Sequence, residues 1–192
     1  MPLCGEMDSD FLFNCDDPIQ GGTEDEMLVV NKDDIASVTV DVTDLTTVTN
    51  VTLKTGKKAF IIDGRKNSIV PTFALTESGV FDVFDHTVNS KGFDLSNTAR
   101  VTLNKMVGGK YIVFTKNIYS GTDGDSKYII SGLKSGLELS GLSGNPTDDT
   151  QGAFDITFST RINKEPKVPA AMFDTDEATT EAIWESLKIA AV

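Results

Sequence analysis

The fold class is decided most clearly by the stretch Ala153-Phe154-Asp155-Ile156-Thr157-Phe158-Ser159-Thr160. Its large apolar side chains, at positions 154, 156 and 158, alternate with smaller or polar ones. This period of two is typical of a strand with one buried face. The same alternation occurs near the other end of the chain, in Val38-Thr39-Val40-Asp41-Val42. The sequence therefore predicts a mainly β protein.

Further β-rich runs predict more strands, roughly eight to ten short ones in all. They cover residues 27–30, 48–53, 59–62, 69–75, 80–88, 111–115 and 128–130. Residues 69–75 and 80–88 are predicted as a strand pair closed by Glu77-Ser78-Gly79. The Asp123-Gly124 pair is a strong hairpin signal between the last two of these runs. We also expect a long hairpin over residues 54–75, with the basic pair Arg65 and Lys66 in the polar stretch at its tip.

Two helices interrupt the β pattern. In residues 95–107, Leu95, Ala99 and Leu103 recur at helical spacing, with Ser96 or Asn97 as the cap and Gly108-Gly109 as the end. Near the C-terminus, Asp174 and Glu177 have the spacing of a capping box. The predicted buried stripe of this second helix is Ala178, Ala182, Ile183 and Leu187.

The first 26 residues differ from the rest, because acids and glycines dominate them and only one apolar patch, Phe11-Leu12-Phe13, interrupts them. This composition favours an extended N-terminal arm over residues 1–26, anchored by the apolar patch. Residues 27–192 are then one β-rich domain. Cys4 and Cys15 in the arm are expected to be free thiols that pack as small side chains.

The chain of 192 residues has a net charge of −12, which disfavours binding to the phosphate backbone of a nucleic acid. Such acidity could simply keep the protein soluble, or it could line a surface past which DNA slides without sticking. The sequence has no apolar run long enough to span a membrane and no signal typical of secretion. We therefore expect folding in a cytoplasm, without a membrane partner.

The sequence offers few groups for catalysis. A nucleophilic triad and most zinc sites need histidine, and His86 is the single histidine, on a predicted strand. We interpret it as a residue of the surface or core. Asp123-Gly124-Asp125 is interpreted as a hairpin tip and not as a calcium loop. These observations predict no enzyme activity, no catalytic residue, no bound metal and no cofactor, although paired carboxylates of a hydrolase stay as an open alternative.

Several short motifs together resemble structural proteins of tailed-bacteriophage necks and tails. The N-terminal part matches in Cys4, in Asn14-Cys15-Asp16-Asp17 and in Gly21-Gly22. The middle resembles tail-tube-like subunits in a strand pair that ends near His86, a helix over 95–107 and the strand of residues 110–114. The later stretches 132–137, 154–160 and 172–175 are similar too. The resemblance is strongest to the ring or tail-barrel proteins of crAss-like gut phages.

The resemblance implies a β-sandwich or rolled barrel of the tail-tube type, with one internal helix and a C-terminal helix. It implies a virion protein, assembled in the host cytoplasm, whose copies join into a six- or twelve-fold ring next to portal, ring or tail-hub proteins. Genomic DNA would pass the lumen without specific binding. The arm and the long hairpin would contact neighbouring rings, through Phe11 and Phe13 in the arm and through Arg65 and Lys66 in the hairpin.

A different class of function stays open beside this one. A carbohydrate- or receptor-binding β-sandwich, such as a capsid decoration or an adhesin module, would have a similar strand content. It would be a monomer or trimer with exposed aromatic loop residues, and Tyr119 near the predicted turn is the one candidate for such a residue. The number of subunits separates the two alternatives.

Overall fold

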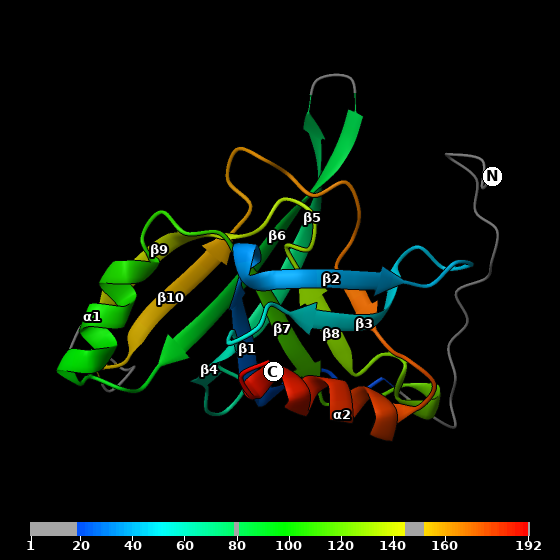
Figure 1. Ribbon diagram of the computed structural model, residues 1–192. Coiled ribbons are helices and arrows are strands. Elements are labelled where there is room, and N and C mark those ends of the chain that lie inside the picture. The colour runs from blue at the N-terminus through cyan, green and yellow to red at the C-terminus, as the bar shows by residue number, and fades with distance from the viewer. Residues whose placement is uncertain (1–18, 79–80, 145–151, 192) are drawn as a thin grey trace.

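The computed structural model describes residues 19–78, 81–144 and 152–191 (Figure 1). Strands make up 46% and helices 17%, which confirms the predicted mainly β fold with two α-helices. The described residues form eleven strands in two sheets. No helix among them is long and apolar enough to cross a membrane.

The larger sheet has seven strands in the order β2-β3-β11-β8-β7-β1-β4. Its neighbouring strands are antiparallel, except that β11 runs parallel to β3. The strands are β1 (Thr23–Asn31), β2 (Ile35–Val40), β3 (Thr47–Leu53), β4 (Phe60–Asp63), β7 (Tyr111–Asn117), β8 (Tyr128–Ser131) and β11 (Ala170–Met172).

The smaller sheet has four antiparallel strands in the order β5-β6-β10-β9. They are β5 (Val70–Ser78), β6 (Phe81–Gly92), β9 (Glu138–Gly144) and β10 (Phe154–Ser159). The alternating stretch that predicted the fold class is β10, with Ile156 and Phe158 buried. It lies inside the sheet, between β6 and β9.

The two sheets and the C-terminal helix form layers around two apolar clusters. Strand β1 is buried on both faces: Met27 and Val29 belong to the cluster between the sheets, and Leu28 and Val30 to the cluster under α2 (Glu177–Lys188). Strand β7 is divided in the same way. Burial on both faces explains why these strands are continuous apolar runs and not alternating ones.

Helix α2 is present, but its predicted details were partly wrong. The residue that caps it is Asp176, whose side chain accepts a hydrogen bond of 2.7 Å from the Thr179 N–H, and not Asp174. The buried side chains of the helix are Thr180, Trp184 and Leu187, whereas Ala182 is exposed. A bulky indole fills the space over the sheet better than the alanines of the predicted stripe, so the helix turns that side inward.

The internal helix α1 (Asn97–Met106) lies within the predicted range, and Ser96 caps it by accepting a hydrogen bond of 3.2 Å from the Ala99 N–H. Leu103 is its buried side chain, and Leu95 is exposed. The predicted hairpin at Asp123-Gly124 is confirmed as the connection from β7 to β8, through a short 3-10 helix (Thr122–Gly124).

The predicted hairpin over residues 54–75 was wrong. Strand β4 pairs with β1 in the larger sheet, whereas β5 pairs with β6 in the smaller one, so residues 64–69 carry the chain between sheets. Arg65 and Lys66 therefore lie in a crossover and not at a hairpin tip. Lys66 and Asn67 have φ angles of 52° and 58°, in the left-handed region. Hairpin turns often contain polar residues with such φ angles, so the sequence of this crossover resembles that of a hairpin turn.

The long hairpin of this protein is instead β5–β6. Its residues pair from Val70 with Asn89 out to Ser78 with Phe81, while β10 pairs only with residues 87–92 of β6. The outer part of the hairpin projects from the body of the molecule (Figure 1). At the other end of the chain, β1 begins at Thr23, so the predicted arm boundary at residue 26 was four residues too late.

Candidate functional site, a pocket lined by lysines

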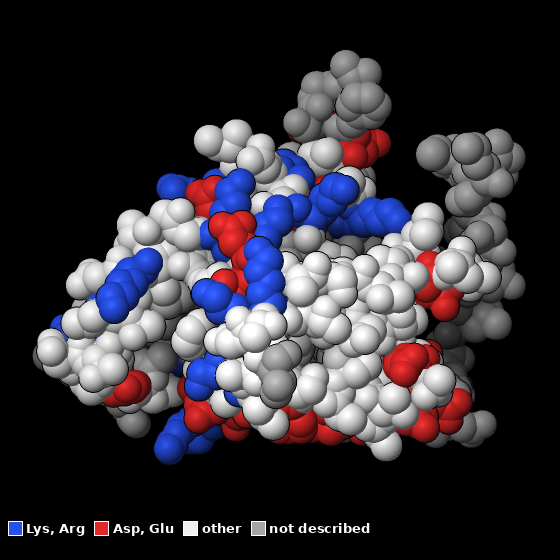
Figure 2. All heavy atoms as spheres, viewed as in Figure 1, with Lys and Arg blue, Asp and Glu red and all other residues white. Residues whose placement is uncertain are grey.

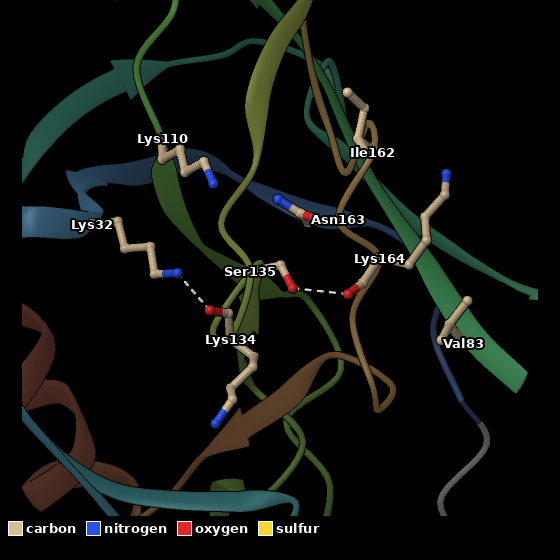
Figure 3. Close-up of a pocket in the computed structure, with 8 residues that line it drawn as sticks. All are labelled: Lys32, Val83, Lys110, Lys134, Ser135, Ile162, Asn163 and Lys164. Carbon is tan, nitrogen blue, oxygen red and sulfur yellow. Dashed lines mark hydrogen bonds between the residues drawn. The ribbon is translucent and has the colours of Figure 1, made fainter. Parts of the chain in front are cut away.

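A pocket of about 440 Å³ opens beyond the end of β1, beside Lys32 and beside Val83 of β6 (Figure 3). We call it the lysine pocket. Lys32 and Lys110 extend into it toward Ser135 and Asn163 (Figure 3). Its lining residues are Lys32, Val83, Lys110, Lys134, Ser135, Ile162, Asn163 and Lys164.

The surface charge is divided between two ends of the molecule. Lys and Arg side chains gather around the lysine pocket, whereas Asp and Glu side chains gather along the opposite edge, where α2 lies (Figures 1 and 2). Four lysines line one pocket in a chain whose net charge is −12. A local positive potential in an acidic protein indicates a surface that attracts anions.

The lysines come together because three segments are joined by backbone hydrogen bonds. The Lys32 N–H, just after β1, donates to the Lys110 carbonyl at 2.9 Å. Tyr111, at the start of β7, exchanges two hydrogen bonds of 2.8 and 2.7 Å with Leu137. These bonds fix residues 132–137, which we call the 132–137 loop, beside the ends of β1 and β7, and Lys134 lies on this loop.

Gly136 lets the lysine stems approach this loop. Its φ angle of 81° lies in the left-handed region that favours glycine. A Cβ atom at this position would lie 3.2 Å from both Lys110 Cβ and Lys32 Cδ. The absence of a side chain at residue 136 therefore allows both lysines to pack closely over the loop.

A buried carboxylate, that of Glu165, binds the backbone of the 132–137 loop. Glu165 is 3% exposed, and its two oxygens accept hydrogen bonds from the N–H groups of Lys134, at 3.0 Å, and Ser135, at 2.6 Å. The Ser135 hydroxyl donates to the Lys164 carbonyl at 2.8 Å. These three bonds connect the loop to the segment after β10, which supplies the other wall of the pocket.

His86 also supports the loop and does not act as a free base. Its Nδ1 accepts a hydrogen bond of 3.2 Å from the Gly132 N–H, so its Nε2, 2.9 Å from the Lys167 carbonyl, must carry the proton. Burial lowers the pKa of His86, against the opposing effects of the Lys167 carbonyl and of the Glu165 and Asp85 charges. The imidazole is thus neutral and has both nitrogens occupied by backbone groups.

The four lysines differ in how far their charges are neutralised. Lys164 forms an ion pair with Asp85, and this hydrogen bond lowers the pKa of the Asp85 carboxyl. The Lys32 ammonium donates to the Lys134 carbonyl at 2.5 Å. Among the described residues, neither the Lys110 nor the Lys134 ammonium has an acidic partner. Four lysines thus lie beside two carboxylates, Asp85 and Glu165, and the site keeps an excess of positive charge.

Chemically, this arrangement suits the binding of carboxylates or phosphates. The Lys32 and Lys110 side chains point into the pocket, whereas those of Lys134 and Lys164 point outward on either side of it (Figure 3). An extended anionic chain can contact such a spread of ammonium groups, and charge-assisted hydrogen bonds are stronger than neutral ones. Within the described ranges, no three His, Cys, Asp or Glu side chains are grouped so as to hold a metal ion.

The site residues predicted from sequence do not form this pocket. Phe11 and Phe13 lie outside the described residues, and Arg65 and Lys66 lie in the crossover between the sheets. The four pocket lysines were missed because they are far apart in sequence and follow no period. The only available signal was that each lies next to the end of a strand or in a connecting loop.

Comparisons of the chain with protein-family models, with curated proteins and with solved structures found no match.

Proposed function

We propose that this chain is a structural subunit without catalytic activity, whose copies assemble into a ring in the neck or tail of a tailed bacteriophage. The observation that carries the proposal is the outer part of the β5–β6 hairpin. Residues 73–78 pair with residues 81–86, beyond the end of β10. Among the described residues, the backbone groups on the other side of this part of β6 bond to Thr160, at His86, and to Glu165, at Phe84, and no strand lies beside residues 81–83. A two-stranded ribbon of this kind is marginally stable in water by itself.

The edge strand of this hairpin carries apolar side chains that a partner could bury. Phe73 is 55% exposed and Leu75 is 63% exposed, on the same face of β5. In the larger sheet, the edge strand β4 also exposes Phe60 and Ile61. Unpaired strand edges with exposed apolar side chains promote association, and natural monomers usually shield them.

The remaining features agree with assembly and not with catalysis. The single histidine is buried and bonded to backbone groups on both nitrogens. The net charge of −12 would let DNA pass a ring lumen by repulsion. The placement of such a ring in a phage neck or tail depends on the sequence resemblance alone.

The test is the mass of the purified full chain by light scattering at several concentrations, followed by negative-stain imaging. We expect rings with a central hole, and we expect Phe73→Ser with Leu75→Ser to weaken assembly. Val107→Ser with Ile189→Ser, which removes two exposed apolar side chains away from the strand edges, is the matched control. A chain that stays monomeric alone, and also when mixed with the other structural proteins of its particle, would contradict the proposal and favour a monomeric binding module.

A further inference from the structure

We infer that the lysine pocket binds the acidic N-terminal segment, residues 1–18, of a second copy of this chain. This inference rests on the proposed self-assembly and names the contact that connects one copy to the next. The partner is thus a peptide rich in carboxylates, held by the ammonium groups of Lys32, Lys110 and Lys134.

Charge complementarity identifies the occupant. The first 31 residues contain eight acids and no Lys or Arg, although the whole chain has 17 basic residues. Five of these acids lie within residues 1–18, and they are Glu6, Asp8, Asp10, Asp16 and Asp17. Elsewhere, acids of the α2 edge are paired with lysines of the same copy, as in Glu177 with Lys127 and Glu181 with Lys116. The N-terminal segment is therefore a source of five carboxylates without basic neighbours in sequence.

The positions of chain entry and pocket fit a head-to-tail contact. The Gly22 carbonyl, just before β1, accepts a hydrogen bond of 3.1 Å from Ile118, at the far end of β7 from Lys110. Lys32 follows the other end of β1, about 26 Å away along a strand of nine residues. The N-terminal segment thus joins the body at one end of the molecule, and the pocket opens at the other.

Copies stacked in one orientation would bring the entry end of one against the pocket end of the next. Such a head-to-tail interface repeats along a ring or a stack. An extended chain of 18 residues reaches at most roughly 60 Å, so the segment could span this contact or fold back onto its own copy. The experiment must therefore separate binding between copies from binding within one copy.

A charge-swap experiment on the full chain makes this separation. The pocket variant is Lys110→Glu with Lys134→Glu, and the segment variant is Asp8→Lys with Asp10→Lys. We expect each variant alone to associate at least about tenfold more weakly than the wild type, because like charges then face each other. An equimolar mixture should regain association, since the reversed segment meets the reversed pocket while the native segment meets the native pocket.

The matched control is Lys58→Glu with Lys105→Glu, which makes the same change of charge at two exposed lysines outside the pocket. We expect this variant to associate like the wild type. Circular dichroism and thermal unfolding confirm that each variant is folded. Raising the salt from about 0.05 M to about 0.5 M should weaken wild-type association, because the contact is electrostatic.

The outcomes distinguish the inference from the proposed function. If the wild type associates and the two variants associate equally well, the inference is wrong and the assembly proposal stands. If each variant loses association and the mixture does not regain it, binding between copies is excluded. A wild type that never associates contradicts both. Binding of a short DNA duplex that the pocket variant loses would assign the pocket to phosphates and overturn the inference.

Discussion

The backbone N–H of Gly132 donates a hydrogen bond of 3.2 Å to Nδ1 of His86, inside the protein. This contact is possible only while Nδ1 carries no proton. A buried histidine bonded to the 132–137 loop therefore connects the stability of the fold to pH.

We expect the free energy of unfolding to fall as the pH drops below about 6.5, the ordinary pKa of histidine in an unfolded chain. Burial lowers the pKa of His86 in the folded state, so the unfolded chain binds the proton first. The stabilisation is complete above pH 6.5 and is lost toward the lowered pKa, at no more than about 1.4 kcal/mol per pH unit.

Urea unfolding between pH 5.5 and 7.5 measures this dependence. His86→Gln cannot titrate, so its stability should change much less over the same range, although it is less stable at pH 7.5. Equal slopes for the wild type and the variant would show that other groups cause the pH dependence.

The second prediction concerns Glu165, which accepts two backbone hydrogen bonds from the 132–137 loop. Glu165→Gln keeps the size of the side chain, but its amide nitrogen cannot accept a bond from an N–H. We expect a loss of about 2 kcal/mol in unfolding free energy, because hydrogen bonds to a charged group are lost and one N–H is left without a partner.

Hydrogen exchange locates this effect. The amides of Lys134 and Ser135 should exchange faster in the variant, while those of β7 change much less. Glu138→Gln, which affects a weaker ion pair at 3.8 Å from Arg161, should stay within about 0.5 kcal/mol of the wild type. Unchanged exchange at residues 134 and 135 would remove Glu165 from the support of the loop.

How far the sequence predicts the molecule depends on whether a feature is local. The alternation in β10 and the run in β1 define strands from neighbouring residues alone, and both are present. The pairing of β5 with β6 agrees with the predicted strand pair. The hairpin over residues 54–75 was mispredicted, because the polar stretch 64–69 resembles a hairpin turn while it connects two different sheets. Whether this stretch is a hairpin turn or a crossover depends on the pairing of β4 with β1, a strand that is distant in sequence.

The site was even less predictable, for the same physical reason. Lys32, Lys110 and Lys134 become neighbours only through the bonds from Lys32 to Lys110 and from Tyr111 to Leu137. Nothing in the sequence around any one of these lysines indicates the other two. Helix α2 shows the same limit at smaller scale, since the sequence predicted Asp174 as the cap, whereas Asp176 caps the helix in the register that buries Trp184.

The third prediction is a gain in stability from Thr115→Val. Thr115 is fully buried in β7, and its hydroxyl has no hydrogen-bond partner among the described residues. Valine has nearly the same shape and replaces the unsatisfied hydroxyl with a methyl group, so we expect a gain of about 1 kcal/mol. Thr39→Val, at an exposed position of the edge strand β2, is the control and should change stability by less than about 0.5 kcal/mol.

The fourth prediction uses an asymmetry between two ion-pair partners. The Lys116 ammonium is buried, lies 4.7 Å from the centre of the Trp184 ring and bonds to Glu181 at 2.9 Å. Glu181 is at the rim of this site and also accepts a hydrogen bond from the Tyr128 hydroxyl. Removing the rim charge leaves the buried one uncompensated, whereas removing the buried charge leaves a carboxylate that water can reach.

We therefore expect Glu181→Gln to destabilise the fold by about 1–2 kcal/mol, less than for a fully buried pair because Glu181 is partly exposed. Lys116→Met fills the same space without a charge and should change stability by less than about 1 kcal/mol. Urea unfolding of both variants at pH 7 measures the difference. If Lys116→Met were the more damaging change, the contact of its ammonium with the Trp184 ring, and not the ion pair, would be the main contribution of this lysine, because methionine keeps the apolar stem and lacks only the charge.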